Sequence, residues 1–452
     1  MGALARGLML ATPTLLAASI VISTFSETGG NWPVLLRPLS LTVVMSLVIT
    51  AIAVSALRRV GAATLASTAT VLMVMGGRPL LMAVGVIAVW SLMAQWRQMH
   101  QRPLPRSPMR ALVIFGVAIF GTSAAWLPLS GAITPRDFVG AAARAERSTE
   151  MPSIYVLVLD SYLRQDTLAQ AFGYDNEPFL GGLEEFNFEV YREATSRTIE
   201  TPLTMLTMLS GDTNDLPDNW VAAAREVRRR LAVAPALDEL SVAGYERVVI
   251  NSSAVHVTMS GWDVTVQPGQ VNNLEAALLS RSPFAPLLTS WVFDQQRERF
   301  RQSLEALVSL VEPEHQRVVL AHLAPPHPPL LFGRDGWAAS PAGCWPRCDL
   351  FAVTPATLGM TRDDFAAAFV DQISVVNERV MEVIEQMLAR DPNAVVITMS
   401  DHGTRSSLGG RAEWNRILLA SRTPGHDRPL AGNLSPVDLF RRLMAVYADD
   451  EP

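Results

Sequence analysis

The sequence of 452 residues contains no lysine, so all 37 of its basic residues are arginine. The absence of lysine says little about chemistry, but the placement of the arginines is informative. They form no basic stripe with interleaved aromatic residues, which is the pattern typical of nucleic-acid-binding proteins. We therefore expect no nucleic-acid partner.

Cysteine is almost absent as well: the chain has two, Cys344 and Cys348, in the segment "AGCWPRCDL". A zinc site of the Cys₄ or Cys₃His type is excluded, because no further cysteine exists to complete it. In an oxidising compartment the pair favours a small loop-closing disulfide, and half of a metal site is the alternative.

Acidic residues are scarce in the first 130 residues, where Glu27 is the only one. A helix needs roughly 20 apolar residues to cross the hydrocarbon core of a bilayer. Apolar segments lie near residues 7–25, 35–57, 60–76, 79–95 and 110–130. We therefore predict a membrane domain of about five helices over residues 1–130. The first segment could also be a cleaved signal peptide, but the later ones favour a retained helix, and whether the short third segment crosses stays open.

The arginines near these segments predict their orientation, because positively charged loops stay in the cytoplasm. Loops on one side of the predicted membrane domain carry Arg6, Arg58, Arg59, Arg97, Arg102, Arg106 and Arg110. Five spans that begin in the cytoplasm place the rest of the chain outside it. We expect a multi-pass membrane protein, in which residues 131–151 form a linker and residues 152–452 form an extracytoplasmic domain.

The predicted outer domain alternates strand and helix patterns. Apolar runs that suit buried strands are "SIYVLVLD", "RVVINSS", "RVVLAHL" and "AVVITMS". Helical patterns lie between them, and the longest runs from Asp363 to Arg390 after a predicted cap formed by Thr361 and Asp364. This alternation predicts an α/β/α sandwich around a mostly parallel central sheet.

Residues suited to metal binding follow two of these strands. The stretch "VVITMSDHGTR" places Asp401 and His402 after a buried strand, and Asp160 follows another. Asp and His are good ligands for Zn²⁺ and Mn²⁺, and sites in such sheets collect at the carboxyl ends of strands. The segment "EATSRTIETPLTMLTMLSG" between them offers a series of hydroxyl groups.

Together these motifs resemble the alkaline phosphatase and sulfatase superfamily, over roughly residues 150–450. The narrower resemblance is to its membrane-anchored, sulfatase-like branch, which includes phosphoethanolamine transferases and lipoteichoic acid synthases. "IYVLVLDSYLRQDTL" looks like the family's first strand with its metal-binding acid, and "TPLTMLTMLSG" looks like its nucleophile helix. "HLAPPHPPLLFGRDG" and "SDHG" are similar to its histidine segment and its second metal motif. The resemblance implies an alkaline phosphatase-like fold.

The same resemblance implies one divalent metal, Zn²⁺ or Mn²⁺, bound by two carboxylates, a hydroxyl and an imidazole: Asp160, Asp401, Thr201 and His402. It also implies that Thr201 is the nucleophile, since the family's nucleophile lies ten residues before the glycine that ends its helix, here Gly211. Thr198 and Thr204 are the competing hydroxyls.

Substrate contacts are implied for three further residues. His327 in "PPHPP" would bind the substrate phosphate or help the leaving group, and it is favoured over His322. Arg197 and Arg405 flank the two motifs and suit bidentate contact with phosphate oxygens.

The implied function is a membrane-bound transferase. It would move a phospho-headgroup, of the phosphoethanolamine or phosphoglycerol type, from a membrane lipid to an envelope glycan or lipid through a phospho-threonine intermediate. A hydrolase with water as acceptor would use the same site, and a non-catalytic lipid-binding regulator is the third alternative. Sulfate-ester hydrolysis through formylglycine is not expected, because that residue is made from cysteine or serine and not from threonine.

Overall fold

The computed structural model describes residues 3–28, 32–57, 64, 67–68, 151–218, 220–251, 259, 261–269, 274–275, 278–279, 285–333, 355, 359–403, 413–426, 430 and 434–448. The chain divides into two compact units. Residues 1–134 and 272–289 form the first, and residues 135–271 and 290–452 form the second.

The first unit contains two long helices, α1 (Ala3–Thr28) and α2 (Trp32–Leu57). They pack through a small apolar cluster that includes Val21, Phe25 and Leu35 and is joined by Leu274 from the later segment. Within the described residues, one stretch of helix, Leu35–Ala53, is long and apolar enough to cross a membrane. The three predicted spans after residue 57 fall outside the described residues, apart from positions 64 and 67–68.

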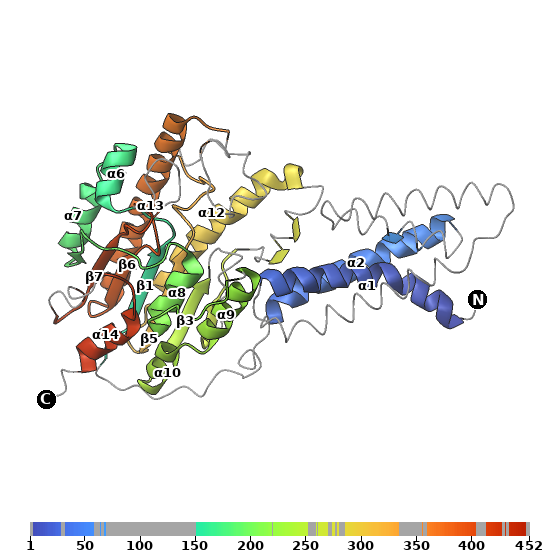
Figure 1. The fold of residues 1–452 in the computed structure, drawn as a ribbon, viewed down its shortest axis with the longest axis horizontal. Helices are drawn as coiled ribbons and strands as arrows, with labels where there is room; N and C mark the ends of the chain where they lie inside the picture. Colours follow the sequence, from blue (N-terminus) through green and yellow to red (C-terminus); the bar gives the residue numbers. More distant parts are fainter. Residues whose placement is uncertain are drawn as a thin grey trace. The chain divides into compact units, whose positions relative to one another are not determined.

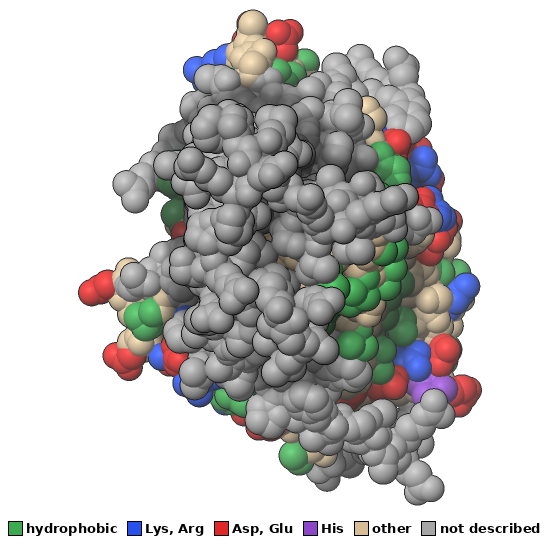
Figure 2. Space-filling view, turned by 90° about the vertical axis from the view of Figure 1, so that its right-hand side faces the viewer, with side chains coloured by type: hydrophobic (Ala, Val, Ile, Leu, Met, Phe, Trp, Pro, Cys, Tyr) green, Lys and Arg blue, Asp and Glu red, His purple; other side chains and the backbone are tan. Residues whose placement is uncertain are grey.

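One side of α2 exposes large apolar side chains to the surroundings: Leu36, Leu41, Val44, Leu47, Val48 and Ile52. Hydrophobic side chains form a band among the described residues in Figure 2. Extended apolar surface of this kind marks a contact with lipid or with another protein.

The second unit is built on a sheet with the strand order β2-β7-β6-β1-β5-β3-β4 in the described part of the chain. The strands are β1 (Ile154–Leu159), β2 (Glu189–Val190), β3 (Glu246–Asn251), β4 (Val264–Val266), β5 (Arg317–Leu323), β6 (Val395–Met399) and β7 (Leu419–Arg422). The strands from β6 to β4 pair in parallel, while β7 and β2 continue the sheet as antiparallel neighbours. The central β1 is buried along its whole length, as expected for a parallel strand covered on both faces.

Helices cover both faces of this sheet (Figure 1). One face carries α6 (Gln165–Phe172), α7 (Glu177–Glu185), α12 (Ala285–Ser309) and α13 (Arg362–Arg390). The other carries α8 (Thr201–Ser210), α9 (Trp220–Ala232), α10 (Pro235–Val242) and α14 (Leu439–Ala448). The predicted α/β/α sandwich with a mostly parallel sheet is confirmed.

Local sequence signals fix several of these elements. The predicted cap of α13 is present, because the Thr361 hydroxyl accepts a hydrogen bond of 3.1 Å from the Asp364 N–H. The helix buries one continuous apolar face, which includes Phe365, Ile373 and Val380. The short edge strands β2 and β4, and the short strand β7 between β2 and β6, were not predicted from the sequence.

The strand order decides where the site forms. β1 lies between β6 and β5, with Val158 opposite both Met399 and His322. Because all three strands run in the same direction, their carboxyl ends meet at one edge of the sheet. The residues that follow β1 and β6 are therefore neighbours, although they are far apart in the sequence.

Candidate metal centre

The structure brings Asp160, Asp401 and His402 together at this edge. All three side chains are buried, and each offers a ligand atom that lies within 4.8 Å of the other two. His402 Nε2 lies 3.4 Å from Asp401 Oδ2 and 3.8 Å from Asp160 Oδ1. Two carboxylates and an imidazole in this arrangement are the donor set that Zn²⁺ or Mn²⁺ takes.

Thr201 joins this group from helix α8. It is the first residue of the helix, followed by Pro202, and proline fits the first turn because that turn leaves its N–H groups without helical partners. The Thr201 hydroxyl lies 3.3 Å from His402 Nε2. The positive end of the helix dipole therefore points at the same place as the candidate ligands, which favours a bound anion there.

The His402 ring is oriented by its own backbone. Its Nδ1 lies 2.7 Å from the Gly403 carbonyl oxygen. A carbonyl can only accept a hydrogen bond, so Nδ1 carries the proton. The lone pair of the neutral ring is then on Nε2, which faces Thr201 and the two carboxylates.

Asp401 has one oxygen satisfied by the protein and one that is not. Its Oδ1 accepts hydrogen bonds from the N–H groups of Ser161 (3.1 Å) and His402 (2.9 Å). Its Oδ2 is buried and accepts no hydrogen bond from the described residues. Because a buried carboxylate oxygen without a donor is costly, a divalent cation fits this position well.

Burial alone raises the pKa of the Asp401 carboxyl, but the facing imidazoles and its hydrogen bonds outweigh burial. His402 contributes most of this opposing effect, followed by His322, and the hydrogen bond from the Ser161 N–H adds to it. The net pKa of Asp401 is therefore below its ordinary value. The group is a carboxylate at neutral pH, as a metal ligand must be.

The two competing hydroxyls, of Thr204 in α8 and of Thr198 before it, form hydrogen bonds away from His402. Thr204 Oγ1 donates a 3.0 Å hydrogen bond to the Asp401 carbonyl, and Thr198 Oγ1 lies 2.6 Å from Thr204 Oγ1. Since Thr204 uses its proton on the carbonyl, Thr198 donates to Thr204. Of the three threonines, Thr201 is the one whose hydroxyl faces His402.

Two residues that lie beside the site were not selected as site residues from the sequence. His322, at the end of β5, places its Nε2 3.5 Å from Asp160 Oδ2. Burial lowers its pKa to about 4, so the ring is neutral at neutral pH. Ser161, directly after Asp160, adopts a positive φ of 62°. The His322 position could have been inferred from its strand end, whereas no sequence signal indicates the backbone of Ser161.

The remaining predicted residues of the site and of the disulfide are His327, Arg197, Arg405, Cys344 and Cys348. His327 is half-buried, and its Nδ1 lies 2.5 Å from the Pro328 carbonyl oxygen. Arg197 is exposed and precedes α8. Arg405, Cys344 and Cys348 fall outside the described residues.

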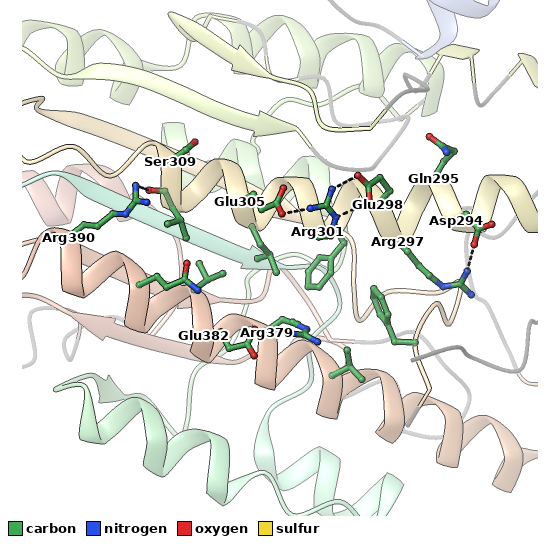
Figure 3. A pocket seen from close by; sticks show the side chains of 17 residues that line it. Asp294, Gln295, Arg297, Glu298, Arg301, Glu305, Ser309, Arg379, Glu382 and Arg390 are labelled. Carbon is green, nitrogen blue, oxygen red and sulfur yellow. Dashed lines mark hydrogen bonds and ion pairs between the residues drawn. The ribbon is translucent and has the colours of Figure 1, made fainter. Parts of the chain in front are cut away.

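A separate cavity of about 940 Å³ lies between α12 and α13 (Figure 3). Two of its arginines face acidic partners: Arg301 pairs with Glu298 and Glu305, and Arg379 pairs with Glu382. Phe300, Leu304 and other apolar side chains of the two helices also line the cavity. None of the candidate metal-site residues lines it.

No family model matches this sequence, and no curated protein matches it. Its structure is similar to the integral membrane lipooligosaccharide phosphoethanolamine transferase A of Neisseria meningitidis, at 13% identity and a TM-score of 0.42, over 98% of this chain and 95% of that one. The zinc complex of the C-terminal periplasmic domain of EcEptC from Escherichia coli matches at 14% identity and a TM-score of 0.38, over 65% of this chain and 82% of that one. A putative sulfatase from Bacteroides thetaiotaomicron matches at 14% identity and a TM-score of 0.40, over 67% and 72% of the two chains. These proteins are of the kinds that the sequence motifs resemble.

Proposed function

We propose that this chain is a metal-dependent, membrane-bound transferase that acts through a phosphorylated Thr201. The donor is a membrane lipid with a phosphoethanolamine or phosphoglycerol headgroup, and the acceptor is an envelope glycan or lipid. One observation carries the proposal. A threonine hydroxyl at a helix N-terminus lies 3.3 Å from His402 Nε2, inside a buried group of two aspartates and a histidine.

The metal ligands in this proposal are Asp160, Thr201, Asp401 and His402, around Zn²⁺ or Mn²⁺. A bound divalent cation supplies Lewis acidity, which lowers the pKa of a hydroxyl and neutralises charge on phosphoryl oxygens. The protein holds the ligands in place: Gly403 fixes the His402 ring, and backbone N–H groups fix one oxygen of Asp401.

The reaction proceeds in two transfers. The Thr201 oxygen attacks the phosphorus of the lipid headgroup, the bond from phosphorus to the diacylglycerol oxygen breaks, and the released alcohol takes up a proton. A hydroxyl of the acceptor then attacks the phosphorus of phospho-Thr201, and the threonine hydroxyl is restored with the acceptor's proton. In this scheme His327 assists the leaving group, and Arg197 and Arg405 bind phosphate oxygens.

The membrane part of the proposal rests on the first unit. The apolar stretch Leu35–Ala53 and the exposed apolar side of α2 support a membrane anchor. We propose that residues 1–130 form a multi-pass domain of the inner membrane and that residues 152–452 lie outside the cytoplasm. Such an arrangement puts the catalytic residues on the side of the membrane where envelope acceptors are found.

The test is mass spectrometry of the purified full chain after incubation with mixed bacterial phospholipids. We expect a phospho-headgroup adduct on the peptide that contains residues 198–211, and no adduct in Thr201→Ala. Thr198→Ala is the matched control and keeps the adduct, because its hydroxyl faces Thr204 and not the metal site. An adduct on Thr198, or Thr201→Ala with unchanged turnover, would contradict the assignment.

Product analysis separates the transferase from a hydrolase with the same site. With a glycan acceptor present, a transferase yields a modified glycan. A hydrolase yields the free phospho-headgroup whether or not the glycan is present. Because a hydrolase would use the same nucleophile, this measurement decides the acceptor and not the site.

A further inference from the structure

Ser161 stands out because its backbone conformation is unusual for its residue type. Its φ of 62° lies in the left-handed region, which serine adopts at an energetic cost because of its Cβ atom. The residue is 2% exposed, so the conformation is not a feature of a free loop. Strained backbone of this kind persists where the surrounding structure requires it.

The left-handed turn lets Ser161 contact three of the four proposed ligands. Its N–H donates to Asp401 Oδ1 at 3.1 Å, across from the neighbouring strand. Its hydroxyl donates to Asp160 Oδ1 at 3.1 Å, and the Ser161 Oγ atom also lies 3.4 Å from His402 Nδ1. These assignments agree with one another, because His402 Nδ1 carries a proton and the Ser161 oxygen can accept it.

We propose that Ser161 is a positioning residue for the metal centre: its backbone N–H orients Asp401 and its hydroxyl orients Asp160. The inference rests on the proposed function, and it deepens it. Asp160 follows β1 and Asp401 follows β6. Ser161 links the two carboxylates, because it hydrogen-bonds to both of them. Removing a residue that holds a metal ligand in place by a hydrogen bond typically weakens metal affinity by about 10–100-fold.

Two substitutions separate this positioning role from a purely structural one. Ser161→Ala removes the hydroxyl and keeps a Cβ that opposes the positive φ, whereas Ser161→Gly removes the hydroxyl and adopts the positive φ freely. We expect both variants to bind Zn²⁺ about 10–100-fold more weakly than the wild type. We also expect the metal-free Gly variant to unfold at a higher temperature than the Ala variant. Glycine would thus recover stability without recovering metal affinity.

The experiment uses the full chain in detergent, stripped of metal, with Zn²⁺ affinity measured by competition with a chromogenic chelator. Asn187→Gly is the matched control, because Asn187 has the same φ of 62° but is exposed at the end of α7. We expect this control to leave the Zn²⁺ dissociation constant unchanged. A Ser161→Gly variant that binds Zn²⁺ within about twofold of the wild type would overturn the inference.

A parallel measurement on Asp401→Asn tells this inference apart from the proposed function. If Asp401→Asn loses Zn²⁺ and Ser161→Gly does not, the metal centre stands and the role of Ser161 is wrong. If the wild-type chain binds neither Zn²⁺ nor Mn²⁺ at this site, both proposals are wrong.

Discussion

His322 and Asp401 show how single buried groups connect the site to stability. Each is enclosed by protein, and each has a pKa below its ordinary value, but the causes differ. For His322 burial is the main cause, because the charged ring loses its hydration. For Asp401 burial acts in the opposite direction, and the facing histidines outweigh it.

The metal-free protein should lose stability as the pH falls below about 6.5. The unfolded chain binds a proton on His322 near that pH, whereas the folded chain does so only near a pKa of about 4. Stability therefore rises with pH between these two values, by at most about 3 kcal/mol from this group. Asp401, with a lowered pKa, adds stability above its ordinary pKa that disappears in stronger acid.

The measurement is the thermal unfolding midpoint of the metal-free chain between about pH 4 and 7. We expect His322→Gln to flatten this dependence. His315→Gln is the control for the change of residue type, because His315 is exposed in the turn before β5. An unchanged slope in His322→Gln would show that another group is responsible.

Helix α8 illustrates how one element serves both packing and chemistry. It runs from Thr201 to Ser210 and is capped by Gly211, which takes a left-handed φ of 84°. Thr204, one turn into the helix, ties α8 to the end of β6 through its bond to the Asp401 carbonyl. The position of the Thr201 hydroxyl therefore depends on a second threonine of the same helix.

Replacing Thr204 with valine removes that connection without changing the side-chain volume much. We expect the free energy of unfolding to fall by about 1–2 kcal/mol. Turnover should fall at least about tenfold, because small displacements of reacting groups are costly. Both quantities are measured on the purified chain, by thermal unfolding and by transfer of the lipid headgroup.

Thr207→Val is the control for this change. Thr207 is equally buried, and its hydroxyl bonds to the Thr204 carbonyl within the helix. It should lose similar stability and keep normal turnover. Equal losses of turnover in the two variants would mean that Thr204 acts only through the stability of α8.

At the scale of the whole molecule, two units of different character share one chain. The first has an apolar helix with an exposed apolar side, and the second has a sheet buried between helix layers. Residues 272–289 belong to the first unit, although they lie between two stretches of sequence that form the second unit. There Arg37 and Glu275 form an ion pair.

The proposed topology places the second unit outside the cytoplasm. Protease added to intact spheroplasts should remove a tag placed after residue 452, while a cytoplasmic marker protein stays whole. Immunoblotting of both proteins provides the measurement. A tag that is digested only after lysis would place the second unit in the cytoplasm and contradict the proposed orientation.

The sequence by itself determined the features that depend on neighbouring residues. Burial periodicity gave the central strands and α13, and the cap at Thr361 is a local hydrogen bond. Asp160, Asp401 and His402 could be selected because each follows a recognisable buried strand. The short strands β2, β4 and β7 have two to four residues each, too few to show a pattern.

Only the tertiary structure decided how these features combine. Thr201 and His402 are separated by 201 positions, and the order of the strands brings them within 3.3 Å. The same packing turns Thr198 and Thr204 away from His402, brings His322 beside Asp160, and holds Ser161 at a positive φ. These outcomes depend on strand register and on contacts between distant segments. A sequence pattern describes the faces of single elements, and it does not specify which faces meet.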